Sequence, residues 1–220
     1  MFRRSGLILA TALALLSSGC QSGDTKTKTE AGSKAKPKKA KRITRFKFSD
    51  VKSNRKTGGT LKEDKAQLVN EKGERVSLSS FRGKTVVLVF MRGFSGSICP
   101  YCTTYTAQIA SRYSEFKKLG AEVLVVYPTR KADVKQVKTF VKVVNEILEE
   151  DGREEIPFPV FLDPGTKVVK EYNLLGDLSK PSTFVLDAKG AIRYVYVGRD
   201  TDDRPAIERV VAEVKALKGA

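Results

Sequence analysis

Two cysteines separated by Pro100 and Tyr101 are the residues best placed to do chemistry in this chain. Cys99 and Cys102 follow the apolar, β-branched run Thr85–Phe90 and precede a segment with helical character. On a helix, residues three apart have Cβ atoms roughly 5 to 6 Å apart, so a modest adjustment of the first turn allows a disulfide. The pair is therefore expected to open and close without refolding, as thiol–disulfide or thiol–peroxide chemistry requires.

The two cysteines are expected to have different roles. Pro100 falls where the first helical residue should be, a position that tolerates its missing N–H, and this leaves Cys99 at the N-cap. The positive end of the helix dipole favours a thiolate, and such cysteines have pKa values lowered from about 8.5 to between roughly 3.5 and 7.5. We therefore predict that Cys99 is the nucleophile and that Cys102 is the resolving thiol.

Other uses of a Cys-x-x-Cys pair fit this chain less well. A structural zinc site needs four ligands, but the chain has no His and only one further cysteine, Cys20, far from the pair. A structural disulfide closing so short a loop would remove little unfolded-state entropy. The absence of His also excludes Cys–His hydrolases and His-ligated copper carriers. We expect no metal and no cofactor other than a redox-active Cys99–Cys102 disulfide.

The first 19 residues have the order of a secretory signal. Arg3 and Arg4 precede an apolar run, residues 6–16, and small residues lead to Cys20. This end resembles the lipobox of bacterial lipoproteins, in which the cysteine is lipidated, although Ser17 stands where Leu is usual. The resemblance implies an exported, membrane-anchored lipoprotein facing the periplasm or cell exterior. An ordinary signal or a buried N-terminal hydrophobe is the alternative.

The net charge of +16 is unevenly distributed. Residues 24–57 hold 13 Lys and Arg against 3 acidic residues, whereas residues 58–220 carry a net charge of only +4. So polar a segment cannot bury enough surface to fold. We therefore predict a Lys-rich disordered tether over residues 20–57 and a redox domain over 58–220. The tether either rests on anionic lipid head groups or is a solvated linker, and we expect no nucleic-acid partner.

The domain alternates short apolar runs with helical segments, which indicates an α/β architecture. A hairpin is predicted around Glu71–Gly73, and Gly120 is a helix C-cap candidate. The other predicted strands are Thr85–Phe90, Glu122–Tyr127, Pro159–Leu162, Thr183–Leu186 and Ile192–Val197. The predicted helices are Pro100–Leu119, Lys131–Glu149, Thr166–Glu171 and Arg204–Lys218. The predicted core consists of Val87, Val89, Ile109, Phe116, Leu124, Val126, Phe161, Phe184, Val185 and Val210.

Several of these segments together resemble a known family. Residues 79–84, the strand to Phe90, the Cys99–Cys102 helix start and residues 180–190 resemble thioredoxin-fold proteins of the alkyl hydroperoxide reductase and thiol-specific antioxidant (peroxiredoxin-like) superfamily. The resemblance implies a thioredoxin-like fold, with a central mixed β-sheet flanked by helices, and an antioxidant oxidoreductase. Pro181 matches the cis proline that faces the redox pair in thioredoxin-like members. Its alternative is an ordinary strand-initiating proline.

If Pro181 faces the pair, it has no N–H to compete with substrate. The N–H and carbonyl of the preceding Lys180 would then be free to dock an extended substrate segment beside Cys99.

Three positions depart from the peroxidase pattern. Typical peroxiredoxins carry Pro-x-x-x-Thr-x-x-Cys and place an Arg beside the peroxidatic cysteine. Here Arg92 replaces the proline, Gly96 replaces the threonine, and Pro181 stands where the Arg is expected. Arg92 could support a thiolate at Cys99 or be a solvated loop charge, and Tyr101 is a second candidate supporting residue.

These residues favour an exported thiol–disulfide oxidoreductase. A thiol peroxidase acting on hydrogen peroxide or alkyl hydroperoxides is the first alternative, and a non-catalytic tethered binding module is the second. The expected partners are thiols, disulfides or peroxides, an external electron donor, and the membrane through lipid on Cys20.

Overall fold

The computed structural model describes residues 43–60, 67–131 and 133–218. The predicted signal peptide, Cys20 and most of the tether lie outside the described residues. None of the helices in the described ranges is long and apolar enough to cross a membrane.

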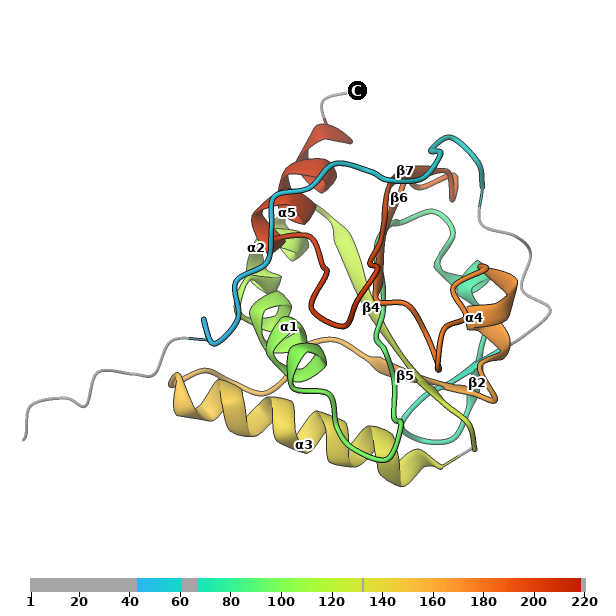
Figure 1. Cartoon of the computed structure of the whole chain (residues 1–220). Coiled ribbons are helices and arrows are strands. Elements are labelled where there is room, and N and C mark those ends of the chain that lie inside the picture. The colour runs from blue at the N-terminus through green and yellow to red at the C-terminus, as the bar shows by residue number, and fades with distance from the viewer. Residues whose placement is uncertain (1–42, 61–66, 132, 219–220) are drawn as a thin grey trace, which may run out of the picture. The chain divides into compact units, whose positions relative to one another are not determined.

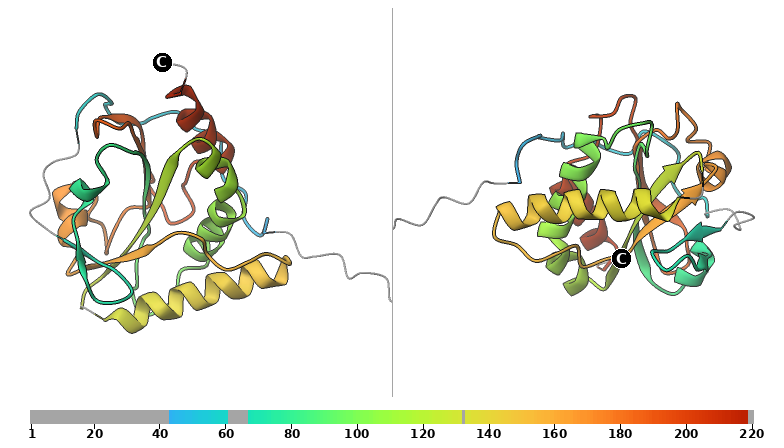
Figure 2. Two further views of the ribbon diagram at one scale, coloured as in Figure 1. Left: turned by 180° about the vertical axis from the view of Figure 1, so that it is seen from behind. Right: turned by 90° about the horizontal axis from the view of Figure 1, so that it is seen from below.

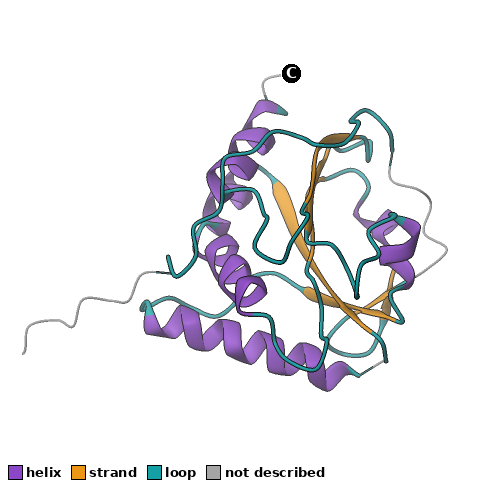
Figure 3. Ribbon diagram, viewed as in Figure 1, coloured by secondary structure: helices purple, strands orange, loops and turns teal. Residues whose placement is uncertain are grey.

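A seven-stranded mixed sheet forms the centre of the domain (Figure 3). The strands are β1 Leu68–Val69, β2 Arg75–Val76, β3 Thr85–Phe90, β4 Ala121–Thr129, β5 Val160–Pro164, β6 Ser182–Leu186 and β7 Ile192–Val197, in the order β2-β1-β5-β4-β3-β6-β7. Strands β3, β4 and β5 are parallel, and the other pairings are antiparallel. The sheet confirms the predicted hairpin and the expected thioredoxin-like fold class.

Helices cover both faces of this sheet (Figures 1 and 2). One face packs against α1 Pro100–Ser111, α2 Tyr113–Lys118, α3 Val134–Glu150 and α5 Ile207–Ala216; the other packs against α4 Lys167–Glu171 and the short 3₁₀ helix η1 Leu78–Phe81. Along β3, Val87 and Val89 face the first layer, and Val86, Leu88 and Phe90 face the second. This alternation follows from the two-residue period of a strand. All ten predicted core residues are buried.

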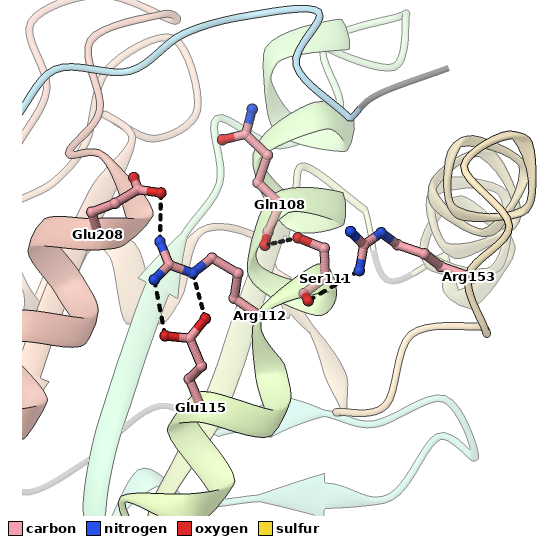
Figure 4. A network of polar contacts seen from close by, with 6 residues as sticks. All are labelled: Gln108, Ser111, Arg112, Glu115, Arg153 and Glu208. Atoms are coloured by element: carbon pink, nitrogen blue, oxygen red, sulfur yellow. Dashed lines mark hydrogen bonds and ion pairs between the residues drawn. The ribbon is translucent and has the colours of Figure 1, made fainter. Parts of the chain in front are cut away.

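The segment predicted as one helix from Pro100 to Leu119 is two helices. Arg112 leaves helical geometry, with φ −114° and ψ 11°, and its N–H bonds Ile109 in the tighter 3₁₀ pattern. Its guanidinium donates to both oxygens of Glu115 and reaches Glu208 on α5 (Figure 4). Arg153 bonds the carbonyl of the adjacent Ser111 (Figure 4). The break thus ties α1 to the elements on either side of it.

Residues 43–57 correct the expected tether boundary, because they pack against the domain. Ile43 is buried, and Phe48 packs against the core with its ring 4.9 Å from that of Tyr105. Gln108 on α1 donates to the carbonyls of Ile43 and Phe46. The high charge of this segment led to the prediction of disorder. Its apolar residues, although separated along the chain, supply the buried surface that a disordered tether lacks.

Candidate active site

The loop from β3 to α1 is held against β4 by a close backbone approach at Gly93. Its φ is +91°, and a Cβ there would lie 2.2 Å from the carbonyl oxygen of Pro128. Phe94 donates to that same oxygen at 3.0 Å. Only glycine permits this approach, and it directs the chain back toward the sheet, so that Cys99 begins α1 beside the end of β3.

Cys99 is the N-cap of α1 and Pro100 is the first helical residue, as predicted. Cys99 is 5% exposed, and both Cys99 and Cys102 are free thiols. A hydrogen bond from the Cys102 thiol, with help from backbone N–H groups and from Arg204, lowers the pKa of Cys99 to about 6 despite its burial. Cys99 is therefore mostly thiolate at neutral pH, which is the form that reacts.

Cys102 has the opposite environment one turn along the helix. It is fully buried, and burial raises the pKa of its thiol above the ordinary value. The hydrogen bond to Cys99 raises it further, because the Cys102 proton is shared with the Cys99 thiolate. The surroundings thus favour a thiolate at Cys99 and a protonated, hydrogen-bond-donating thiol at Cys102.

Arg204 is a residue of this site that sequence reasoning missed. It is 3% exposed, and its Nη2 lies 3.2 Å from the Sγ of Cys102. In the loop that carries Arg204, the backbone of Gly198 lies close to that of Asp203: a Cβ on Gly198 would lie 2.1 Å from the carbonyl oxygen of Asp203. The sequence predicts Arg204 as the first residue of the closing helix, and nothing in its neighbours marks the side chain as buried.

Two buried tyrosines complete the surroundings of the pair. The hydroxyl of Tyr105 lies 3.3 Å from that of Thr183, and burial raises the pKa of Tyr105 to about 12. Tyr127 stacks on Phe140, and its buried hydroxyl has no hydrogen-bond partner among the described residues. Burial, and then the nearby cysteines, raise the pKa of Tyr127. Both tyrosines are therefore donors at neutral pH and cannot serve as bases.

The predicted supporting residues act mainly through their backbone. The guanidinium of Arg92 bonds Ser95 at 2.7 Å and Asp177 at 3.4 Å, whereas its backbone N–H bonds Cys102. The ring of Tyr101 lies 4.2 Å from that of Phe46, and the Tyr101 N–H helps to stabilise the Cys99 thiolate. The Arg92 side chain therefore behaves as a loop charge, and the cation at the pair is a different residue.

The predicted docking role of the Lys180 backbone, next to Pro181, needs correction. Pro181 is buried next to Ser182, which pairs with Phe90 at the end of the sheet where β3 enters the cysteine loop. The N–H of Lys180 bonds the carbonyl of Leu174 at 2.8 Å, and its carbonyl accepts the hydroxyl of Ser182 at 2.9 Å. The Lys180 backbone is therefore occupied by its own fold and is not free to dock a substrate strand.

Gly96 has a structural reason for departing from the peroxidase pattern. Its φ is +99°, a conformation that strains any residue with a Cβ, and β-branched residues most. A threonine would therefore strain the backbone of this turn. The loop before Cys99 is therefore built without a threonine hydroxyl at position 96.

The sequence matches a family model described as the AhpC/TSA family over residues 60–195. The chloroplastic peroxiredoxin Q of Triticum aestivum is 35% identical over 133 residues, which cover 59% of this chain and 54% of that protein. A peroxiredoxin of Thermoplasma volcanium is 30% identical over 154 residues, which cover 68% of this chain and 70% of that protein. The chain thus spans about half the length of the first relative and more of the second.

Solved structures agree on the fold. The mitochondrial 2-Cys peroxiredoxin of Plasmodium falciparum superposes with a TM-score of 0.58 at 21% identity, covering 74% of this chain and 94% of that one. Peroxidoxin BcpB of Mycobacterium tuberculosis gives 0.56 at 21% identity, covering 74% of this chain and 97% of that one. With the match over residues 60–195, the sequence resemblance is confirmed: this chain belongs to the AhpC/TSA family and has the thioredoxin-like fold of the solved peroxiredoxins.

Proposed function

We propose that this protein is a thiol–disulfide oxidoreductase that works through Cys99 and Cys102. The observation that carries the proposal is the asymmetry of the pair. Cys99 has its pKa lowered to about 6 at a helix N-cap, and Cys102 is buried within hydrogen-bonding reach of it. A thiolate with an adjacent protonated thiol is the arrangement that forms a mixed disulfide and then resolves it.

The proposed reaction has two exchanges. The Cys99 thiolate attacks one sulfur of a substrate disulfide, forms a mixed disulfide and releases the other sulfur as a thiolate. Cys102 then loses its proton and attacks the Cys99 sulfur, which forms the internal disulfide and releases the second substrate thiolate. The substrate disulfide is reduced to two thiols while the protein dithiol is oxidised. An external thiol donor returns the protein to its reduced state.

A thiol peroxidase is the second candidate, and membership of the AhpC/TSA family favours it. In that reaction the Cys99 thiolate attacks a peroxide oxygen, becomes a sulfenic acid and releases hydroxide or an alkoxide. Cys102 then condenses with the sulfenic acid and releases water. The loop supplies no hydroxyl at Gly96, and the guanidinium of Arg204 lies against Cys102. For this reason we place disulfide exchange first.

The two activities are separated by measuring them side by side on the full reduced chain. Insulin-disulfide reduction is followed with a thiol donor, and hydrogen peroxide and an alkyl hydroperoxide are consumed in parallel assays, with Cys99→Ser as the control. We expect insulin reduction that depends on Cys99 and peroxide consumption close to that of free thiols. Peroxide consumption far above free thiols, with insulin untouched, would reverse the assignment.

We also propose that the protein is exported and anchored through lipid on Cys20, with a thiol donor on the same side of the membrane. The support is the signal-like order of residues 1–19. Mass spectrometry of membrane-extracted protein should find Cys20 as a lipidated N-terminus. An intact precursor, or an unmodified Cys20 in the soluble fraction, would refute the proposal.

A further inference from the structure

Arg204 is a buried cation whose described partners carry no full negative charge. Its Nη2 contacts Cys102 at 3.2 Å, its Nη1 contacts the sulfur of Met91 at 3.7 Å, and its Nε donates to the carbonyl of Thr201 at 3.2 Å. The guanidinium also lies 5.3 Å from the ring centre of Tyr105. None of the ion pairs within the described ranges includes Arg204.

Burying the Arg204 guanidinium costs folding free energy unless an anion forms beside it. A guanidinium keeps its proton in proteins, so Arg204 cannot escape burial by becoming neutral. Stacking on an aromatic ring offsets only part of the cost of burying the charge. A buried charge is normally paired. Arg204 helps to stabilise the Cys99 thiolate from a distance, whereas the thiol in direct contact with its guanidinium is that of Cys102.

The charge on the pair moves during the proposed reaction. In the reduced protein the negative charge is on Cys99, and the Cys102 proton stabilises it. Once Cys99 has attacked a substrate disulfide, its sulfur is neutral and no longer accepts that hydrogen bond. The next nucleophile is Cys102, which is fully buried and must become a thiolate away from water. This second step is where a cation at Cys102 has its largest effect.

We propose that Arg204 is a catalytic residue of the second exchange, where it stabilises Cys102 as a thiolate. Cys102 gives its proton to the solvent or to the departing substrate thiolate, and its electron pair forms the bond to Cys99 as the bond from Cys99 to the substrate sulfur breaks. In the reverse direction, an external thiolate attacks Cys99 and Cys102 leaves as a thiolate beside Arg204. This inference rests on the proposed function.

The other groups that face Cys102 do not replace Arg204. The Cys99 sulfur is neutral at this stage, and the Arg92 backbone N–H and the Tyr127 hydroxyl are neutral donors. Tyr105 lies under the guanidinium and has its pKa raised to about 12, so it stays neutral as well. Arg204 is therefore the full positive charge at Cys102 in the described part of the chain.

Dithiobis(nitrobenzoate) separates the two steps, because each exchange releases one coloured thiolate. The full chain carrying Cys20→Ser is mixed with this disulfide in a stopped-flow instrument, and the first phase reports attack by Cys99 and the second reports resolution by Cys102. An opposite charge in contact lowers a pKa by 1–3 units, and the higher nucleophilicity of a more basic thiolate cancels nearly half of that gain. We therefore expect Arg204→Met to slow the second phase about tenfold.

The matched variants identify the charge as the cause. Arg204→Lys keeps the charge and should retain more of the second-phase rate than Arg204→Gln, and the pH midpoint of that phase should rise in Arg204→Gln and Arg204→Met. This Lys and Gln pair decides the matter should Arg204→Met fail to fold. Arg199→Met, a substitution in the same loop at a side chain 89% exposed, should leave both phases unchanged.

Two results would overturn the inference, and a third would instead overturn the function on which it rests. Equal second-phase rates and pH midpoints in Arg204→Lys and Arg204→Gln would show that the charge has no role. Equal slowing of both phases would show that Arg204 acts on the pair as a whole. The absence of a first phase in the parent chain would refute the proposed function and leave Arg204 without a reaction.

Discussion

Among the described residues, each face of the sheet buries one charged side chain, and the two charges are stabilised in different ways. On the face under α4, the Asp163 carboxylate accepts the N–H groups of Val168 at 3.0 Å and Val169 at 2.9 Å. On the face under α1 and α5, the Arg204 guanidinium has sulfur atoms, a carbonyl and a ring as partners. The Asp163 carboxylate caps the N-terminus of α4, whereas the Arg204 guanidinium leaves a positive charge beside the thiol of Cys102.

This contrast extends to the packing around each charge. The buried hydrophobic cluster under α4 and η1 consists of Leu, Val and Phe. The cluster on the other face includes Cys99, Cys102 and the buried tyrosines 105 and 127. One face is built for stability, and the other combines stability with groups whose charge changes. Substitutions on the two faces should therefore separate loss of folding from loss of chemistry.

The largest effect is expected from the cysteines. Cys99→Ser should abolish disulfide exchange, because a serine hydroxyl is not a nucleophile at neutral pH. Cys102→Ser should retain the first exchange and accumulate a mixed disulfide, which mass spectrometry of the acid-quenched reaction detects. Disulfide exchange that survives in Cys99→Ser, or a trapped adduct on Cys102, would show that the two cysteines have the opposite roles.

The pH dependence of alkylation should show the difference between the two thiols. With a pKa of about 6, Cys99 should reach its full rate with iodoacetamide by neutral pH, whereas an ordinary cysteine reacts fully only well above pH 8. At pH 7 the thiolate fraction should exceed that of an ordinary cysteine roughly thirtyfold. Because the folded pKa is the lower one, the same ionisation stabilises the fold above the unfolded value and loses this effect as the pH falls through about 6.

Rates are measured on Cys102→Ala in the Cys20→Ser background, so that a single thiol reacts and position 102 has no side-chain donor. The hydrogen bond from Cys102 is the largest cause of the lowered pKa, and the midpoint in this variant therefore tests the backbone and Arg204 contributions without it. The difference from the midpoint of the intact pair measures what Cys102 adds. A midpoint near that of free cysteine in both proteins would contradict the role of Cys99 as a thiolate.

Removing the buried charge of Asp163 should lower the stability of the fold and leave the exchange reaction unchanged. Asp163→Ala leaves two buried N–H groups at the start of α4 without an acceptor, which should cost about 2 kcal/mol of unfolding free energy. Denaturant titration measures this loss. Both phases of dithiobis(nitrobenzoate) exchange should keep their rates at low denaturant, because no reacting atom touches Asp163. A slowed exchange in the folded variant would show that the two faces are not independent.

Much of the fold could be predicted from local patterns. The β3 run and the N-cap at Cys99 follow from period and cap chemistry and are confirmed, and Gly120, with φ +73°, directly follows Leu119, the C-cap of α2. The packing of residues 43–57 could not be predicted in this way, because their charge suggests disorder, and their burial depends on surfaces that form only when α1 and α5 are in place.

The residues of the candidate site also differ in whether local sequence patterns could predict them. The cysteines are identified by their spacing, whereas Arg204 lies 102 residues from Cys102 and is brought to it only by the turn after β7. The backbone partners of Lys180 are likewise set by the folded loop, and a proline before a strand does not reveal them. Sequence therefore locates the reacting atoms, and the three-dimensional fold supplies the charge around them.

The smallest expected effects are changes in unfolding free energy when Tyr105 and Tyr127, the two buried tyrosines near the cysteines, are replaced. Tyr127→Phe removes a hydroxyl that has no hydrogen-bond partner among the described residues, so it should leave the unfolding free energy unchanged or raise it by about 1 kcal/mol. Tyr105→Phe breaks the contact with Thr183 and should lower that free energy by about 1 kcal/mol. Both free energies come from denaturant titration of the reduced chain. Destabilisation by Tyr127→Phe would mean that its hydroxyl is already bonded in solution, and its donor capacity would then not be free for the Cys102 thiolate.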